Sequence, residues 1–138
     1  MTETKVPEDL RYTKNHEWVR VEGSEAVVGI TDFAQGELTD VVFVDLPPTG
    51  KTVDAGASVL VLESVKTVSD VYAPCGGVVS ATNEALKKHP ELINQDPYGS
   101  GWIFRLRVEG SPALDQTIGA DEYRRIIENR ASGASAGA

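Results

Sequence analysis

The stretch Val59-Leu60-Val61-Leu62-Glu63-Ser64-Val65-Lys66-Thr67-Val68-Ser69-Asp70-Val71-Tyr72-Ala73-Pro74 decides how this chain is expected to fold. Two apolar runs rich in β-branched residues flank a polar interruption, which is typical of two strands joined by a turn. Lys66 falls near the tip of that turn, so the sequence predicts a hairpin that presents one lysine to solvent. The turn lacks the Asn-Gly or Asp-Gly pair that most often closes a short hairpin, so turn propensity alone does not explain its residues.

Short strands and turns are predicted on both sides of this hairpin. The expected strands cover 17–21, 26–30, 40–46, 78–80 and 102–108, and the expected helices cover 31–38, 83–94 and 121–130. The last helix has Tyr123, Ile126 and Ile127 on one face and is expected to pack on the sheet. Along 102–108 the even-numbered residues are all apolar and are expected on the buried face, whereas Ile103, Arg105 and Arg107 are expected on the exposed face. Trp18, Trp102 and Phe104 are expected in the core. Residues 1–15 are polar and are expected to form a loosely held lead-in.

These elements predict a mainly β fold, a flattened barrel/sandwich hybrid of short antiparallel strands with short peripheral helices and a C-terminal helix. The connections are too short to hold crossover helices, which disfavours a parallel α/β fold. We expect one domain over residues 1–130. Residues 131–138, which follow this domain, are all Ala, Ser and Gly. They are expected to form a disordered tail because they cannot bury enough surface to offset their ordering entropy.

Composition excludes several classes of function. A formal net charge of −8 argues against nucleic-acid binding, which needs clustered Lys and Arg to contact phosphates. Neither a membrane-spanning run nor a secretory signal is apparent, so we expect a cytoplasmic protein. Cys75 is the single cysteine of the sequence, which rules out an intramolecular disulfide and a cysteine-based metal cluster.

No group of residues in the sequence forms a recognisable active site. His16 and His89 have no metal-ligand spacing, and each is expected to be an exposed or helix-end histidine. Cys75 has no basic neighbour in sequence, so an inert thiol is favoured over a nucleophile. Without a paired acid, base or nucleophile, the chain is predicted to be neither an enzyme nor a metal protein.

Lys66 allows two interpretations. A lysine at a turn is most often a solvated charge that discourages aggregation through sheet edges. Alternatively, a lysine that protrudes from a rigid hairpin is well suited to carry a covalently attached cofactor, because its amine can form a neutral amide at the end of a long flexible stem. Such a tether brings one group to several partners at high effective concentration.

Six blocks of the sequence resemble the H-protein family of the glycine cleavage system. Leu62-Glu63-Ser64-Val65-Lys66, followed by 69–74, is similar to that family's lipoyl-attachment motif. The other five blocks occupy 16–19, 29–35, 42–47, 83–86 and 96–102. Short motifs recur by chance, but six blocks in the same order over nearly the whole chain are specific.

The resemblance implies a lipoyl-carrier domain over residues 1–130, with lipoate in amide linkage on Lys66. Such a carrier takes the aminomethyl group of glycine from a pyridoxal-phosphate-dependent glycine decarboxylase to a tetrahydrofolate-dependent aminomethyltransferase. It then passes electrons to dihydrolipoamide dehydrogenase. A lipoylating enzyme and the partners are expected to recognise Glu63 and Ser64 around the lysine.

The family's loaded arm is expected to fold into a surface cleft. Glu17 and Asp70 resemble the carboxylates that would meet its cationic amine in a charge-assisted contact, and the alternative is that both are solvated acids. Asn15 stands where a serine is frequent in the family, a departure at the same cleft.

Two related carriers remain as alternatives: a biotinyl carrier and a lipoyl domain of another multienzyme complex. Biotinyl carriers usually flank their lysine with methionines, whereas Lys66 lies between Val65 and Thr67. Lipoyl domains of 2-oxo-acid dehydrogenases ordinarily have Asp before the lysine and are linked to an acyltransferase.

Overall fold

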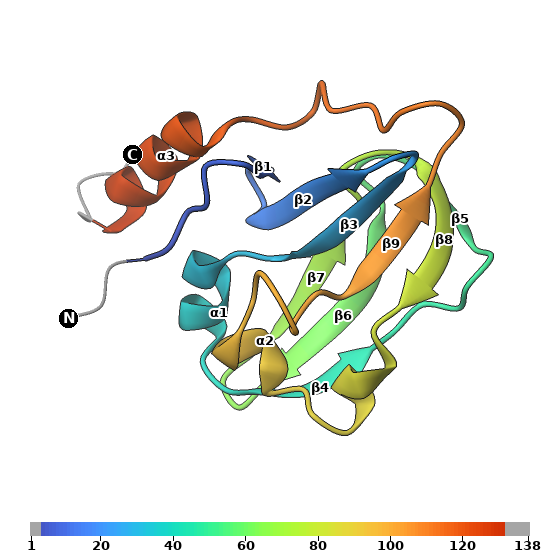
Figure 1. Cartoon of the computed structure of the whole chain (residues 1–138). Coiled ribbons are helices and arrows are strands. Elements are labelled where there is room, and N and C mark those ends of the chain that lie inside the picture. The colour runs from blue at the N-terminus through green and yellow to red at the C-terminus, as the bar shows by residue number, and fades with distance from the viewer. Residues whose placement is uncertain (1–3, 132–138) are drawn as a thin grey trace.

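A computed structural model of the chain describes residues 4–131 (Figure 1). Its strands are β1 (Arg11–Tyr12), β2 (Glu17–Glu22), β3 (Glu25–Ile30), β4 (Val41–Asp45), β5 (Thr52–Val53), β6 (Ser58–Ser64), β7 (Val68–Tyr72), β8 (Gly77–Thr82) and β9 (Phe104–Arg107). Its helices are α1 (Asp32–Leu38), the 3₁₀ helix η1 (Glu84–Lys87), α2 (Leu92–Gln95) and α3 (Ala120–Ala131). The predicted tail therefore lies outside the described residues, except that Ala131 ends α3.

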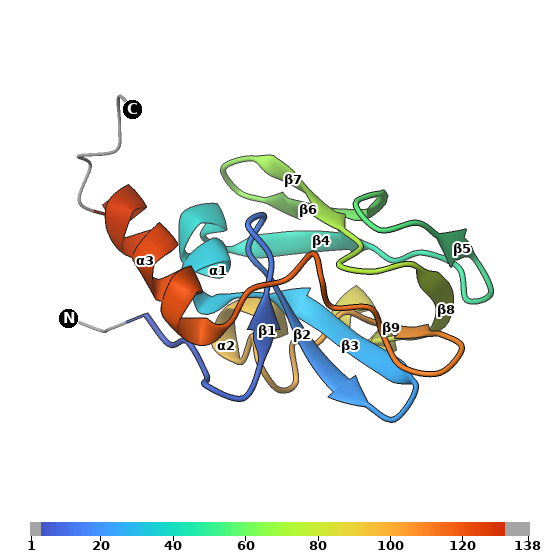
Figure 2. The same ribbon diagram turned by 90° about the horizontal axis from the view of Figure 1, so that it is seen from above.

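The strands form two antiparallel sheets. One sheet has the order β1-β2-β3-β9-β8-β5 and the other has the order β4-β6-β7. Figure 2 shows the smaller sheet lying over the larger one, with α3 beside β1 and α1. Within residues 4–131 the sheets do not close into a barrel. The prediction of a mainly β fold with short antiparallel strands, short helices and a C-terminal helix is confirmed.

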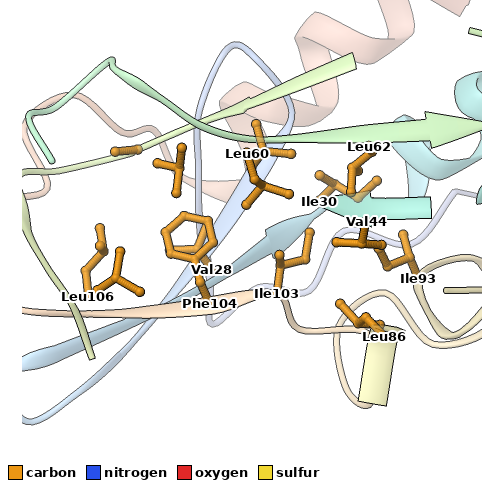
Figure 3. Packing of buried hydrophobic residues seen from close by; sticks show 14 of the residues in the cluster. Val28, Ile30, Val44, Leu60, Leu62, Leu86, Ile93, Ile103, Phe104 and Leu106 are labelled. Carbon is orange, nitrogen blue, oxygen red and sulfur yellow. The ribbon is translucent and has the colours of Figure 1, made fainter. Parts of the chain in front are cut away.

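The main core fills the space between the two sheets (Figure 3). Val28 and Phe104 of the larger sheet face Leu60 and Leu62 of β6, and all four side chains are buried. Apolar side chains removed from water on both sheets stabilise this arrangement by about 25 cal/mol per Å² of buried apolar surface. The apolar residues of the central hairpin are therefore what attach it to the rest of the molecule.

A second apolar cluster covers the other face of the larger sheet. Val27 of β3 and Trp18 of β2 are buried there against Tyr12, Tyr123 and Ile127. Successive residues of a strand point to opposite faces, so Val27 serves this cluster while Val28 serves the main core. Helix α3 thus packs on the sheet as predicted, and Trp18 and Phe104 are core residues as predicted.

The prediction of a loosely held lead-in over residues 1–15 is wrong for its described part. Leu10 and Tyr12 are buried, and β1 pairs with β2. The backbone of Tyr12 also exchanges two hydrogen bonds with Ile118, at 2.8 and 2.7 Å. Apolar residues in this segment are held by α3 and its preceding loop, which lie far away in sequence and give no local signal.

The predicted alternation along 102–108 is also wrong at its start. The strand begins at Phe104, and Ile103 is buried although it was assigned to the exposed face. Trp102, predicted to be core, is only partly buried, with the Arg105 guanidinium 5.6 Å from its ring centroid. The Ile103 amide donates to Val28 and its carbonyl accepts from Asn83, so Ile103 enters the core before regular strand pairing begins.

Candidate cofactor-attachment site

Lys66 lies between β6 and β7, which pair in antiparallel register with Glu63 opposite Val68. The lysine is exposed, as the sequence predicts, and its neighbours Val65 and Thr67 are exposed as well. The hairpin therefore offers a primary amine to solvent at the end of a four-carbon stem. That is the chemistry required of an acceptor for an acyl group.

The Ser64 side chain closes the turn. Its hydroxyl oxygen accepts hydrogen bonds from the Lys66 amide at 3.1 Å and from the Thr67 amide at 3.0 Å. The Ser64 amide donates to the Thr67 carbonyl at 2.8 Å. Serine can close a turn by bonding to the backbone of following residues, and here it replaces the missing Asn-Gly or Asp-Gly pair. This contact gives Ser64 a structural role that sequence reasoning did not identify.

The tip of the hairpin is attached to the segment that follows α1. The Val65 amide donates to the Asp40 carbonyl at 3.0 Å, and Lys66 Nζ lies 3.5 Å from the Glu37 carbonyl oxygen. In Figure 2 the loop between β6 and β7 extends to the side of the molecule that holds α1. The lysine is thus directed toward one end of that helix.

Glu63 lies in a row of exposed residues across the outer face of the small sheet. Strand register places Phe43 and Val68 on either side of Glu63. Phe43 is 51% exposed and Val68 is 63% exposed, which is unusual for large apolar side chains. The predicted recognition residue Glu63 is therefore accessible and flanked by apolar surface close to the lysine.

A groove of about 130 Å³ lies beside α1, near the lysine. Its lining is apolar at Ile30, Phe33, Ala34, Leu38 and Leu62, and polar at Asn15, His16, Glu37, Ser69 and Asp70. Glu37, whose carbonyl approaches Lys66 Nζ, belongs to this lining. An acyl chain attached to the lysine would therefore start at the edge of a groove that combines apolar walls with a carboxylate.

Glu17 is buried, with only 1% of its surface exposed. Its carboxylate accepts hydrogen bonds from the Thr13 hydroxyl at 2.5 Å and from the Tyr72 amide at 3.0 Å. Burial raises the pKa of Glu17, and these two hydrogen bonds oppose that shift in part. A nearby cation would favour the ionised form of such a carboxylate.

The structure places the two predicted cleft carboxylates in different hollows. Asp70 lines the groove beside α1, where its side chain accepts from the Ser58 hydroxyl at 2.8 Å. Glu17 lines a larger hollow of about 460 Å³ between residues 13–17 and 115–118. Asn15 lines both hollows, so they adjoin at this residue. A joint role of Glu17 and Asp70 stays a prediction.

The remaining candidates have the following positions. His16 is partly buried rather than exposed: its ring lies 5.0 Å from that of Phe33, and its Nδ1 is 2.8 Å from the Tyr123 hydroxyl. His89 is exposed beside Glu91, as expected. Cys75 is buried, and burial raises the pKa of its thiol, which agrees with an inert role. Residues 4–131 contain no group of three His, Cys, Asp or Glu side chains arranged to hold a metal ion.

No helix in the described part of the chain is both long and apolar enough to cross a membrane.

Comparisons with known proteins agree on one family. Residues 10–130 match the family model described as "Glycine cleavage H-protein". The chain is 52% identical over 126 residues to the "Glycine cleavage system H protein" of Thermus thermophilus, covering 91% of this chain and 98% of that protein. It is 53% identical over 123 residues to the "Probable glycine cleavage system H protein" of Haloarcula marismortui, covering 89% and 97%. The crystal structure of a glycine cleavage system H protein from Mycobacterium marinum superposes with a TM-score of 0.79 at 38% identity, covering 87% and 97%.

Proposed function

The chain belongs to the glycine cleavage H-protein family, and from this membership we propose that its Lys66 carries lipoate in amide linkage. Members of the family are non-catalytic lipoyl carriers of the glycine cleavage system. The observation that carries the proposal is the exposed Lys66 at the hairpin tip, within the Glu63-Ser64-Val65-Lys66 sequence. The family match favours lipoate over biotin, the alternative that the sequence left open.

The hairpin supports this role by combining a rigid base with a flexible arm. Ser64 holds the backbone of Lys66 and Thr67, and Val65 is tied to Asp40. Beyond this base, the lysine side chain approaches the Glu37 carbonyl oxygen at 3.5 Å through Nζ and is otherwise exposed to solvent. An acyl group on Nζ would therefore move through a limited volume around a fixed point, which raises its effective concentration at a docked partner.

We further propose that the groove beside α1 receives the arm. Its apolar residues, among them Phe33 and Leu62, suit a hydrocarbon chain, and Asp70 suits a cationic amine. When bound, lipoate supplies a dithiolane that accepts and releases the aminomethyl group and carries electrons. Glu17 is proposed as a second carboxylate for the amine, reached through the adjoining hollow at Asn15. The groove would shield a group that water can otherwise attack.

The proposed partners are a pyridoxal-phosphate-dependent glycine decarboxylase, a tetrahydrofolate-dependent aminomethyltransferase, dihydrolipoamide dehydrogenase and a lipoylating enzyme. Each must reach Lys66, so each must approach the hairpin tip. The exposed row of Phe43, Glu63 and Val68 supports recognition there, because apolar surface with one charge suits a protein interface. A cytoplasmic location is part of the same proposal and stays a prediction.

Mass spectrometry tests the attachment site. The full-length chain is incubated with lipoate, ATP and a lipoylating enzyme, and intact mass and peptide mapping are recorded. We expect one lipoyl group, located on Lys66, and none on Lys66→Arg. Lys51→Arg is the matched control, because it changes another exposed lysine and should be modified like the natural chain.

The carrier role is then tested with the purified enzymes of glycine cleavage. Lys66→Arg is expected to abolish folate-coupled decarboxylation of glycine, while Lys51→Arg supports it at the natural rate. Glycine cleavage sustained by Lys66→Arg, or a lipoyl group mapped to another lysine, would refute the proposal.

A further inference from the structure

One hydroxyl group of α3 joins two parts of the groove wall. Tyr123 is 0% exposed, and its hydroxyl lies 2.8 Å from His16 Nδ1 and 2.7 Å from Thr31 Oγ1. His16 lines the groove, and Thr31 is the N-cap of α1, the helix that supplies one side of it. Tyr123 itself does not line the groove. The hydrogen bonds to these two residues therefore connect it to the groove.

The contact with Thr31 bears on the start of α1. The Thr31 hydroxyl accepts from the Ala34 amide at 3.1 Å, a typical N-cap bond, and the Thr31 carbonyl accepts from Gln35 at 3.0 Å. Phe33 and Ala34, which line the groove, belong to this first turn. A hydroxyl held by Tyr123 stays in the orientation that caps the helix.

The contact with His16 bears on the loop between β1 and β2. His16 has a φ of 71°, a left-handed conformation that is uncommon outside glycine and persists only where surrounding contacts impose it. Its carbonyl accepts from the Thr31 amide at 3.0 Å, and its ring lies against Phe33. The contact with the Tyr123 hydroxyl restricts the rotation of the imidazole ring.

Tyr123 is held in place by contacts that do not involve the groove. Its ring stacks on Tyr12 with centroids 4.7 Å apart and planes 8° from parallel. The Tyr12 hydroxyl donates to the Pro7 carbonyl at 2.6 Å, and Pro7 does not line the groove. Removing the Tyr123 hydroxyl alone would thus leave the ring and α3 where they are. The pair Tyr12 and Tyr123 offers two stacked phenols, of which only one contacts the groove wall.

We propose that Tyr123 is a positioning residue for the groove: through its hydroxyl, α3 holds the His16 ring and the first turn of α1 in the arrangement that a docked arm contacts. The inference rests on the proposed function, because the arm on Lys66 is what the groove would receive. It gives the C-terminal helix a role beyond covering the sheet.

The first test uses the unmodified protein, so it does not depend on lipoate. Tyr123→Phe is compared with Tyr12→Phe, which removes the other hydroxyl of the stacked pair. We expect Tyr123→Phe to increase amide hydrogen exchange at Ala34 about fivefold, the change that loss of one hydrogen bond of typical net strength gives. The imidazole nitrogen shifts of His16 should move as well. Tyr12→Phe should leave both unchanged, and Thr31→Ser, which keeps a hydroxyl, should retain slow exchange.

The second test uses the lipoylated protein after loading with the aminomethyl group. Without the aminomethyltransferase, water slowly releases ammonia and formaldehyde from the arm and leaves a free thiol. We expect the loaded Tyr123→Phe protein to lose ammonia at a higher rate than the natural chain. The loaded Tyr12→Phe protein should lose ammonia at the same rate as the natural chain. Both variants should be lipoylated on Lys66 to the same extent.

The two ideas fail in different ways. Absence of lipoate from Lys66 in every variant would refute the proposed function, while the exchange and nitrogen-shift measurements would still decide the role of Tyr123. Unchanged Ala34 exchange and unchanged His16 shifts in folded Tyr123→Phe would overturn the positioning role even if all variants are lipoylated. Equal effects of Tyr12→Phe and Tyr123→Phe would also overturn it, because they would show a general loosening of the stacked pair.

Discussion

The hairpin tip around Lys66 and the cluster around Tyr12 and Tyr123 are built in opposite ways. The tip is exposed, and its turn is held mainly by residues within three positions of one another, with Ser64 at the centre. The cluster is buried and joins the two ends of the chain, with Tyr12 stacked on Tyr123. A cofactor arm needs an accessible residue on a firm base, whereas a groove wall needs parts that do not move. The accessible residue and the rigid wall thus lie in two different regions of the molecule, and the groove lies between these regions.

The largest expected difference between the regions is in stability. Tyr12→Ala removes a fully buried, stacked ring, so we expect the free energy of unfolding to fall by about 3–5 kcal/mol, as for other large-to-small aromatic substitutions. Lys66→Ala removes an exposed side chain and should change it by less than about 0.5 kcal/mol. Guanidinium unfolding of the unmodified protein measures both. Similar losses for the two variants would show that the tip is structural, contrary to this comparison.

Glu17 offers a pH-dependent test at the base of the hairpin, where it accepts from the Tyr72 amide. Burial raises its pKa in the folded protein above the value in the unfolded chain. Protonation of Glu17 therefore contributes stability that is fully present below the unfolded pKa and is lost as the pH rises through the folded pKa. Glu17→Gln keeps an acceptor for the amide but does not titrate.

The stability of Glu17→Gln relative to the natural chain should consequently increase as the pH rises from about 4, just below the reference pKa of Glu, to 7. Urea unfolding of both proteins at several pH values measures the difference. Asp54→Asn, which removes an exposed carboxylate instead of a buried one, is the matched variant for comparison. A difference that decreases with pH would mean that the Thr13 and Tyr72 hydrogen bonds outweigh burial.

The same contrast explains what the sequence could predict. The hairpin, the exposed Lys66 and the apolar face of α3 have local patterns, and all three were predicted correctly. The burial of Val6, Leu10 and Tyr12 could not be predicted, because β1 and Ile118 meet only in the folded chain.

The groove was anticipated only through the family resemblance. Apolar residues such as Leu62 and Phe33 give the same sequence signal in a core as in a groove wall. His16 was expected to be exposed because its partner Tyr123 lies at the other end of the chain. The closure of the turn by Ser64 did have a local signal, since serine bonds readily to the backbone two or three residues on.

Ser64→Ala tests how far the tip depends on that local contact. Loss of the acceptor for the Lys66 and Thr67 amides should lower the free energy of unfolding by about 1 kcal/mol, since both amides are exposed and can bond to water instead. Amide exchange at the two positions should become faster. Ser69→Ala serves as the control, because the Ser69 hydroxyl makes only a long hydrogen bond of 3.4 Å to the Asp70 carbonyl. Equal effects of both substitutions on stability and amide exchange would show that Ser64 has no special role in the turn.

The smallest expected effect concerns α1, which lies between the two regions and forms one wall of the groove. Gly36 is an exposed residue inside this helix, and a Cβ added there meets no atom within 4 Å. Gly36→Ala should therefore raise the free energy of unfolding by about 0.5–1 kcal/mol, because alanine loses less backbone entropy on forming a helix. Gly23→Ala is the matched contrast: it also has open space around it, but its φ of +64° disfavours any side chain, so it should destabilise the protein. Thermal unfolding of both variants measures the pair. If Gly36→Ala is stabilising yet speeds ammonia release from the loaded protein, then the groove needs a mobile α1, and the wall that Tyr123 holds is less rigid than its contacts indicate.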